Sequence, residues 1–313
     1  MATSPPNNRR HGPRFSISQI STFPASFEDD LAAYSGAGLD GIGIWELKLP
    51  ADGGDARALE ALEASGLEPA SAVPAIPSPL PLPLLGGPTD PQERIDAICA
   101  SIHRLAAFGA PGIVCLSGSG LGLDPDEARA TVVGALRTFA AEAELAGTRL
   151  AFEPYQANGG GEWTIVSTIP DAVELIADAG GSRALGLQFD TWHLWNTPTV
   201  LDDVAAHIDL IAGVHVSDVR RPERGWCDRL LPGDGVADLR ALLGALDAAG
   251  WNGLYDLEIF SDNGTFGNHY PDSLWDVPAA ELARRGRAAS AAAWETVRRL
   301  APAGQSQQPK EGE

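Results

Sequence analysis

The strongest constraint in this chain is a repeated alternation. Short apolar segments and longer amphipathic ones follow each other eight times between residues 14 and 300. The short segments have the length and composition of buried strands, and the longer ones have helical periodicity. Strands joined by helices run parallel, in a sheet that is covered on both faces. Eight such units with no break in composition predict one α/β domain, a single (β/α)8 TIM barrel.

The predicted barrel spans residues 15–300, between a flexible N-terminal arm, 1–14, and a disordered polar tail, 301–313. Its strands are expected over 15–21, 41–46, 68–76, 112–117, 149–153, 185–190, 212–217 and 254–260. Its helices are expected over 27–37, 55–65, 91–108, 124–146, 170–178, 201–209, 236–249 and 279–300. The competing fold, an open doubly wound sheet, normally carries a glycine-rich phosphate turn after an early strand. Neither of the first two predicted strands is followed by such a turn, which favours the barrel.

Charge and composition exclude several classes of partner. The 313-residue chain has 22 Lys and Arg against 42 Asp and Glu, a formal net charge of −20. A surface this acidic repels phosphate backbones and anionic lipid, so we expect neither a nucleic-acid partner nor a membrane partner. No run of 18 apolar residues predicts a membrane span, and the first residues lack the apolar core of a signal peptide. With three cysteines and no disulfide framework, a reducing, cytoplasmic location is the expectation.

Four successive predicted strands carry side chains that bind metals. Glu153 ends the fifth strand, Asp190 ends the sixth, His215 lies in the seventh and Glu258 in the eighth. Catalytic groups of a barrel lie at the carboxyl ends of its strands, so these four should converge at one mouth. A carboxylate there can instead cap a helix or pair with an arginine, but four metal-binding side chains, one on each of four successive strands, are hard to explain in that way. Three carboxylates and one imidazole suit one divalent metal, Mn²⁺ first, with Mg²⁺, Co²⁺ and Zn²⁺ as alternatives.

These four residues and the segments around them resemble the metal site of the sugar phosphate isomerase/epimerase family. That family is part of the xylose-isomerase-like TIM barrel superfamily, with D-tagatose 3-epimerase-like and inosose dehydratase-like enzymes. The segments that carry the resemblance are LAFEP, FDTWHLW, GVHVSD, LPGDG and GLYDLEIF, and the likeness runs from about residue 15 to residue 300. The resemblance implies a barrel enzyme that acts on a sugar or keto-sugar through a bound divalent metal.

The chemistry of such an enzyme accounts for these residue types. Epimerising or isomerising a ketose requires removal of a proton next to a carbonyl. A metal that holds the carbonyl and a neighbouring hydroxyl stabilises the resulting enediolate, and two carboxylates take and return the proton. By the resemblance, Glu153 and Glu258 are both ligands and catalytic residues, whereas Asp190 and His215 are ligands only. The sequence therefore predicts a metal-dependent sugar isomerase or epimerase.

Five further residues are predicted to contact the substrate. The resemblance implies this role for His193, in the loop after the sixth strand, and for Arg221, in the loop after the seventh, with Arg220 as the alternative register. Glu46 ends the second predicted strand and Gln19 lies on the first, so both are expected to reach the same mouth. Trp192 is one of several aromatic side chains in the predicted upper loops, whose faces suit a sugar ring. These aromatic residues are Trp45, Trp163, Trp192, Trp195, Trp226, Phe266, Tyr270 and Trp275.

Two other functions stay open at this stage. If the enolate expels a neighbouring group instead of being reprotonated, the enzyme is a lyase or dehydratase of an inosose or a 3-keto-glycoside, with His193 or Glu46 as the acid. A non-catalytic barrel that serves as a partner subunit is the third interpretation, and the complete set of four ligands argues against it. Because barrels of this kind often self-associate, we also expect a homo-oligomer.

Overall fold

Eight parallel strands close into a barrel in the computed structural model, which describes residues 12–51, 53–83, 85–156 and 161–299. Around the barrel the order is β1, β10, β7, β6, β5, β4, β3, β2. The strands are β1 (Arg14–Ser18), β2 (Gly41–Trp45), β3 (Glu68–Val73), β4 (Ile113–Cys115), β5 (Leu150–Phe152), β6 (Leu185–Asp190), β7 (Ile211–Val216) and β10 (Leu254–Leu257). The predicted TIM barrel is confirmed. The predicted arm as far as residue 11 and the whole predicted tail lie outside the described residues.

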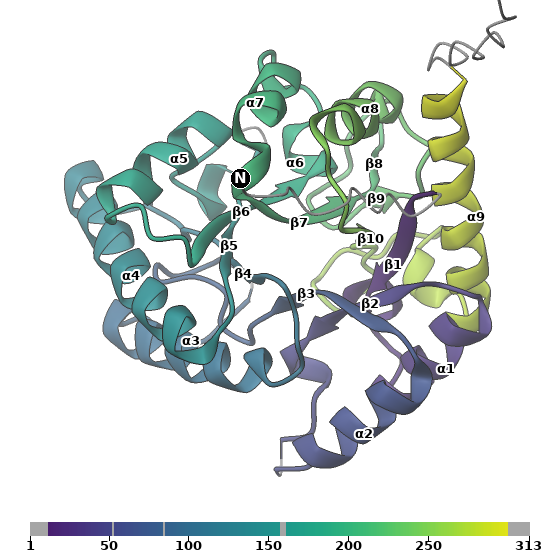
Figure 1. Cartoon of the computed structure of the whole chain (residues 1–313), viewed down its shortest axis with the longest axis horizontal. Helices are drawn as coiled ribbons and strands as arrows, with labels where there is room; N and C mark the ends of the chain where they lie inside the picture. Colours follow the sequence, from purple (N-terminus) through teal and green to yellow (C-terminus); the bar gives the residue numbers. More distant parts are fainter. Residues whose placement is uncertain (1–11, 52, 84, 157–160, 300–313) are drawn as a thin grey trace, which may run out of the picture.

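Helices surround this barrel and cover its outer face (Figure 1). They are α1 (Phe27–Gly36), α2 (Asp55–Ser65), α3 (Pro91–Ala106), α4 (Pro125–Ala146), α5 (Ile169–Asp178), α7 (Val200–His207), α8 (Leu239–Ala249) and α9 (Ala279–Arg298). A single turn, α6 (Thr191–Leu194), follows β6 directly. Short 3-10 turns are η1 (Gln19–Thr22), η2 (Glu46–Lys48), η3 (Gly161–Trp163), η4 (Ile208–Leu210) and η5 (Leu274–Asp276).

Capping residues explain where the predicted helices begin and end. The Asp124 side chain accepts hydrogen bonds from backbone N–H groups in the first turn of α4, and Pro125 occupies a position that needs no donor. Asp90 and Pro91 do the same for α3. Gly147 ends α4 with φ of 71°, in the left-handed region that glycine adopts without strain. These local signals are visible in the sequence, which is why the helix bounds agree closely with the prediction.

The strands are shorter than predicted at the mouth of the barrel. β1 ends at Ser18, so Gln19 lies in η1 and not on the strand. Beyond this point a side chain replaces the backbone ladder between β1 and β10. The Ser21 hydroxyl donates to the Leu257 carbonyl (3.0 Å) and accepts from the Ile259 N–H (2.9 Å). The hydrophobic pattern of the sequence does not reveal that a side chain takes the place of a backbone partner, because the pattern reports burial and not the partner of each backbone group.

The loop after β7 contains a feature that the sequence analysis did not predict. Two short strands, β8 (Asp218–Val219) and β9 (Arg229–Leu230), pair in an antiparallel hairpin. The Asp218 carboxylate fixes the chain beyond the hairpin by accepting the N–H groups of Gly233 (2.9 Å) and Ala237 (3.0 Å). This hairpin brings Arg229 to the mouth of the barrel.

The space between strands and helices is apolar, whereas the inside of the barrel is partly polar. Leu150, Leu187 and Leu257 belong to the continuous apolar core that includes side chains of the surrounding helices. Inside the barrel, Ser71 on β3 contacts Asp256 on β10, and both are fully buried. Buried polar groups require hydrogen-bond partners, so these side chains are expected to bond to other polar groups at the mouth of the barrel.

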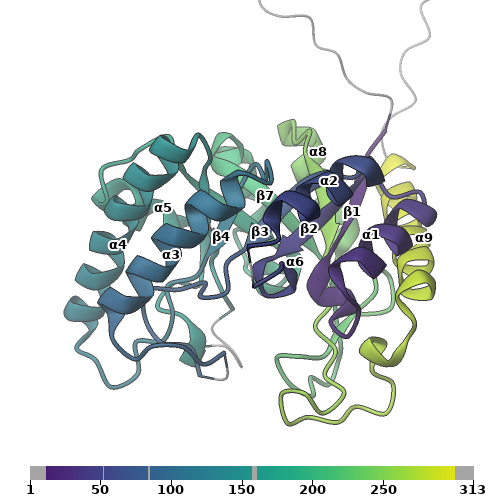
Figure 2. The same cartoon turned by 90° about the horizontal axis from the view of Figure 1, so that it is seen from below.

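Long loops extend from one side of the barrel, and Figure 2 shows those after β7 and β10 in green and yellow-green. Trp275, in the loop after β10, stacks on Phe23 at a ring-centroid distance of 4.9 Å. Among the described residues, no helix combines the length and the apolar character that crossing a membrane requires.

Candidate active site

The four predicted metal ligands come together at the carboxyl ends of their strands. Glu153 and Glu258 directly follow β5 and β10, Asp190 ends β6 and His215 lies near the end of β7. His215 Nδ1 lies 3.3 Å from Glu258 Oε2 and 3.6 Å from Glu153 Oε1. Ligand atoms of Asp190, His215 and Glu258 all lie within 4.8 Å of one another. All four side chains are buried, so the predicted convergence is present in the structure.

An arginine that the sequence analysis missed lies against this cluster. Arg229 Nη1 donates to Asp190 Oδ2 and to Glu258 Oε2, both at 2.8 Å. Its guanidinium lies between two aromatic rings, 5.0 Å from the centroid of Trp192 and 4.8 Å from that of Phe260. Ion pairs and ring contacts of this kind hold a buried guanidinium in one place. The one signal in the sequence was its position two residues before the LPGDG segment.

His193 completes the polar side of the site. Its Nε2 lies 3.2 Å from Arg229 Nη2, and because a guanidinium only donates, Nε2 is the acceptor. Burial and the charges of Arg229 and His215 hold the pKa of His193 well below its ordinary value. The ring lies against Tyr155 at a centroid distance of 3.5 Å. The structure therefore places His193, one of the predicted substrate contacts, as a neutral imidazole beside the predicted ligands.

A buried hydrogen-bond pair supports His215 from inside the barrel. The Ser71 hydroxyl donates to Asp256 Oδ2 at 3.0 Å and lies 3.2 Å from His215 Nε2. Since its proton is given to Asp256, Ser71 accepts from the Nε2–H of His215. Gly43 makes room for this arrangement, because a Cβ there would lie 2.1 Å from Asp256 Oδ2. When His215 is neutral, the pair therefore leaves its lone pair on Nδ1, the nitrogen that faces Glu153 and Glu258.

The donor set fits a divalent metal. Among the described residues, the buried atoms Glu153 Oε1 and His215 Nδ1 have no hydrogen-bond partner. Unpaired buried polar atoms are costly unless something binds them. Carboxylate oxygens and one imidazole nitrogen are ligands for Mn²⁺, Mg²⁺, Co²⁺ or Zn²⁺. A cation held by these residues together with Asp190 and Glu258 would satisfy both atoms.

The two glutamates differ in how strongly they hold a proton. Burial raises the pKa of Glu153 to about 7. Burial acts in the same direction on Glu258, but the neighbouring charges of His215 and Arg229 outweigh it and lower the pKa of Glu258. For His215, the effect of burial is outweighed by Glu258 and Glu153, and its pKa is raised. Carboxylates whose pKa values move apart suit an acid and a base that act as a pair.

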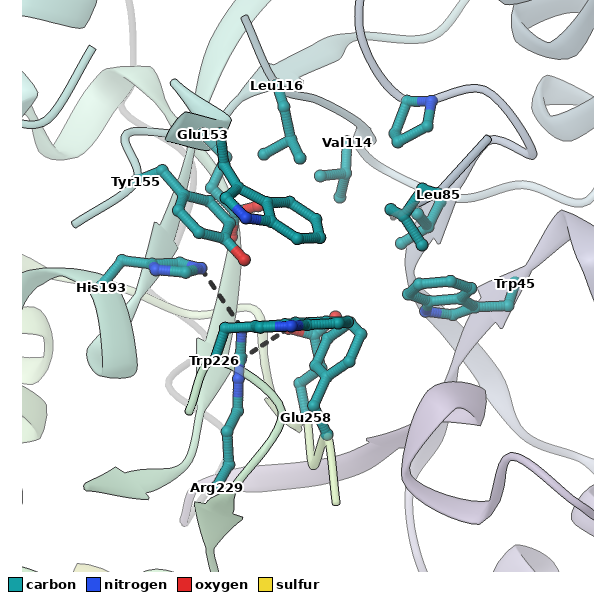
Figure 3. A pocket seen from close by; sticks show the side chains of 14 residues that line it. Trp45, Leu85, Val114, Leu116, Glu153, Tyr155, His193, Trp226, Arg229 and Glu258 are labelled. Carbon is teal, nitrogen blue, oxygen red and sulfur yellow. Dashed lines mark hydrogen bonds and ion pairs between the residues drawn. The ribbon is translucent and has the colours of Figure 1, made fainter. Parts of the chain in front are cut away.

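A narrow pocket opens above these groups (Figure 3). Glu153, His193, Arg229 and Glu258 form one side of it. Loop residues Trp163 and Trp226 cover it, with ring centroids 4.7 Å apart. The cavity volume is about 40 Å³, room for a few water molecules at roughly 10–15 Å³ each. A ligand of six carbons therefore needs the loop-borne aromatic side chains to move outward.

Two predicted substrate contacts have other partners in the structure. Gln19 is buried and bonds Asp30 through Nε2 (2.9 Å) and the Trp45 N–H through Oε1 (3.1 Å). Glu46 accepts hydrogen bonds from the Ala75 N–H (2.8 Å) and the Ser101 hydroxyl (2.6 Å). Neither lines the pocket described above. Both brace the backbone around the mouth, and the structure does not bring them to the predicted ligands.

Arg221 also lies away from the pocket. Its side chain is 45% exposed, pairs with Glu223 at 2.8 Å and lies over the ring of Trp195. The alternative, Arg220, pairs with Asp228 and Asp272. Neither arginine is among the residues that line the pocket. The loop folds back through the β8–β9 hairpin, so the arginine that reaches the site is Arg229.

The predicted aromatic group divides between the pocket and its surroundings. Trp45, Trp163 and Trp226 line the pocket. Trp192 is buried behind Arg229, where its ring faces the guanidinium. Phe266 packs against Trp275, at a centroid distance of 5.9 Å, in the loop after β10. Sequence pattern identified aromatic loops but not which of their rings face the cavity, because loop residues have no periodicity.

Comparisons with known proteins agree with this architecture. A family model described as Xylose isomerase-like TIM barrel matches residues 31–292. Among solved structures, a protein from Sinorhizobium meliloti 1021 is 24% identical, with TM-score 0.77 over 89% of this chain and 98% of the other. The IolI protein with a bound zinc atom is 19% identical, with TM-score 0.73 over 91% and 98%. D-psicose 3-epimerase from Clostridium cellulolyticum H10, solved with D-tagatose, is 17% identical, with TM-score 0.73 over 91% and 99%. No curated protein sequence matches the chain.

Proposed function

The chain belongs to the xylose isomerase-like TIM barrel family, and on this basis we propose that it is a divalent-metal-dependent isomerase or epimerase of a sugar or keto-sugar. The observation that carries the proposal is the buried cluster of Glu153, Asp190, His215 and Glu258. Two of its atoms, Glu153 Oε1 and His215 Nδ1, have no hydrogen-bond partner and lie 3.6 Å apart, so one cation could bind both. Solved structures of similar fold include a zinc-bound protein and a sugar epimerase, which supports the choice of metal-dependent chemistry on a sugar.

Glu153, Asp190, His215 and Glu258 are the residues that would hold the metal. When bound, the metal supplies positive charge that stabilises the negative oxygens of a substrate deprotonated next to its carbonyl. Arg229 lies where it can donate to an oxygen of the same substrate, once its own partners Asp190 and Glu258 are engaged elsewhere. Each ligand is fixed by a strand end, so little reorganisation is needed.

The proton transfers are assigned to the two glutamates. Glu153 and Glu258 approach His215 Nδ1 from different strands, β5 and β10, which places a carboxylate on either side of a ligand held between them. One removes the proton next to the carbonyl, and the other, in its protonated form, donates its own proton to the opposite face of that carbon or to the neighbouring carbon. The neutral His193 and the covering aromatic side chains would hold the substrate and limit water.

Deuterium exchange tests this proposal. The full-length protein is stripped with chelator, reloaded with Mn²⁺ and incubated in D₂O with ketoses, inososes and 3-keto-glucosides, while NMR follows deuterium uptake and products. We expect metal-dependent deuterium next to the carbonyl, reduced by about a thousandfold in Glu153→Gln and Glu258→Gln. Glu127→Gln on the exposed face of α4 is the matched control and should exchange normally.

The product then decides the reaction. An epimer or positional isomer supports the proposal, and an unsaturated ketone would instead identify the lyase or dehydratase alternative. A protein that binds no divalent metal at this cluster would overturn the central claim. A metal-loaded protein that exchanges no proton on any of these carbonyl compounds would point to the non-catalytic interpretation.

A further inference from the structure

The mouth of the barrel is divided into a polar half and an apolar half. The predicted metal ligands lie at or directly after the carboxyl ends of β5, β6, β7 and β10. Across the pocket, β2 ends in Trp45 and β3 ends in Val73. Val114 lies on β4, and Leu116 directly follows the end of β4. Figure 3 shows Trp45 across the pocket from His193, with Leu116 and Val114 along the edge between Glu153 and Trp45. Two contiguous sets of strands thus present opposite chemistry to one ligand.

The apolar half is built on the frame of the barrel. Val73, Val114 and Leu116 are buried. Val114 pairs with Ala151 of β5, and Leu116 directly follows the β4–β5 pairing. Leu116 is held by its own N–H, which donates to the Pro77 carbonyl at 2.7 Å. Trp45 is fixed by its indole N–H, which donates to Ser18 Oγ at 3.0 Å. Opening of the loop-borne cover would leave these strand-borne side chains in place, so the ligand meets them.

A polyhydroxylated ligand would be poorly matched to this wall. Among the pocket-lining residues that the structure describes, the polar side chains gather on the ligand side, around Glu153, His193, Arg229 and Glu258. A hydroxyl that loses water and gains no partner costs about 1–3 kcal/mol. Each apolar carbon placed there gains roughly 0.8 kcal/mol instead. A sugar-binding aromatic platform normally works with a few polar groups beside it, and here Trp45 packs in one apolar cluster with Val73 and Val114.

The wall also argues against a phosphorylated ligand. Of the described residues that line the pocket, Arg229 is the one cation. Its Nη1 bonds Asp190 and Glu258 and its Nη2 faces His193, so both groups lie toward the polar half of the mouth. A phosphate group on the apolar side would be buried without a partner, which is far more costly than a buried hydroxyl.

We infer that the substrate is a hydroxy-carbonyl compound with a compact apolar group, aryl or alkyl, at the end remote from the metal. A keto-sugar with an apolar aglycone belongs to this class, and a free sugar or sugar phosphate does not. The inference rests on the proposed function, because the metal-binding cluster fixes which end of the ligand is polar. It adds the substrate class, which the ligand set alone leaves open.

Three hydroxamates with one metal-binding group and different tails test this inference. Acetohydroxamate, benzohydroxamate and gluconohydroxamate all bind a divalent metal through the same two oxygens, so differences in affinity report on the tail. Their binding to the Mn²⁺-loaded full-length protein is measured by calorimetry. We expect benzohydroxamate to bind at least about tenfold tighter than gluconohydroxamate and tighter than acetohydroxamate, since its ring buries apolar surface.

Variants in the wall make the test specific. Val114→Thr places a hydroxyl in the apolar half with little change in shape and should reduce the preference for benzohydroxamate about threefold or more. Val73→Thr is the second variant if the first one folds poorly. Val132→Thr, buried in α4 away from the pocket, is the matched control and should keep the wild-type preference.

The outcomes separate the two proposals. Equal or tighter binding of gluconohydroxamate to the loaded protein would overturn the apolar-tail inference and leave the metal site standing. A preference for benzohydroxamate that both wall variants leave unchanged would also overturn it, because the ring would then bind elsewhere. Failure of all three hydroxamates to bind the loaded protein would remove the proposed function, and the inference with it.

Discussion

Ser71 helps to orient the predicted metal ligand His215, because its one hydroxyl connects Asp256 to His215 inside the barrel. It donates to the carboxylate at 3.0 Å and lies 3.2 Å from the imidazole Nε2. The connection holds the ring orientation and keeps the lone pair on Nδ1. Residues that orient a metal-binding histidine in this way typically contribute 10–100-fold to metal affinity, as an order of magnitude.

We therefore expect Ser71→Ala to weaken Mn²⁺ binding about tenfold or more while the fold is retained. Calorimetric titration of the chelator-stripped protein measures this directly. Ser101→Ala is the control, since Ser101 is also buried but bonds Glu46, away from the cluster. Wild-type affinity in Ser71→Ala would show that the hydroxyl does not orient His215.

Asp30 gives the fold a pH dependence of its own. Burial raises its pKa to about 6, although Lys48, at 2.6 Å, and the hydroxyl of Thr22 favour the charged form. The folded state therefore retains this proton up to about pH 6, whereas the unfolded chain releases it near 3.8. The stabilisation from this proton is complete below the unfolded-state pKa of 3.8, and it is lost as the pH rises through the folded-state pKa of about 6.

For this reason the free energy of unfolding should show a loss from Asp30 of about 2 kcal/mol between roughly pH 4.5 and 6.5. Urea denaturation across this range, compared between wild type and Asp30→Asn, isolates the contribution. In the variant this part of the pH dependence should vanish. Glu28→Gln, an exposed change on the same helix, should keep the wild-type profile. Parallel profiles for wild type and Asp30→Asn would contradict the assignment.

At the scale of an element, one arginine organises the proline-rich segment between β3 and α3. Arg94 is buried and donates through Nε to the Ser78 carbonyl (2.8 Å) and through Nη2 to the Ser78 hydroxyl (3.0 Å). Its Nη1 reaches the Pro88 carbonyl at 3.0 Å. The segment contributes Pro77 and Leu85 to the pocket, so the guanidinium helps to shape a wall that it does not touch.

Arg94→Lys should loosen this segment, because an ammonium group cannot reproduce the planar set of donors. We expect a loss of about 2–3 kcal/mol in the free energy of unfolding. Hydrogen exchange should be faster at the Leu80 N–H, which bonds the Ser117 carbonyl. Arg129→Lys, at an exposed pair on α4, should change stability by less than about 0.5 kcal/mol. Unchanged exchange at Leu80 in Arg94→Lys would show that the segment is held by other contacts.

Elements were predicted better than their ends. The helix over 55–65 and the strand over 185–190 match the structure because caps and apolar runs mark them locally. The extra turn η1 and the β8–β9 hairpin depend on contacts distant in sequence, such as the Ser21 hydroxyl with β10. Those contacts leave no periodic pattern, so the sequence could not reveal them.

At the scale of the whole molecule, the eightfold alternation was sufficient to predict the barrel, and the barrel was sufficient to bring four distant residues together. Glu153 and Glu258 meet because parallel strands all end at one mouth. Arg229 was missed and Arg221 was expected in its place, because a loop of irregular backbone decides which of two nearby arginines turns inward. Topology thus fixes the strand-borne part of a site, and the loop-borne part requires the structure. Self-association stays a prediction.

The divided mouth has a consequence for how such an enzyme could be altered. The apolar half comes from residues 45–116 and the predicted ligands from residues 153–258, so the two lie in separate, consecutive stretches of the chain. A new preference could arise by replacing the first stretch while the second is inherited unchanged. In a library of chimaeras that exchange these two stretches, the stretch with the predicted ligands should determine the reaction, and the stretch with the apolar half should determine which substrate is preferred. One reaction could then be kept while the preferred substrate changes.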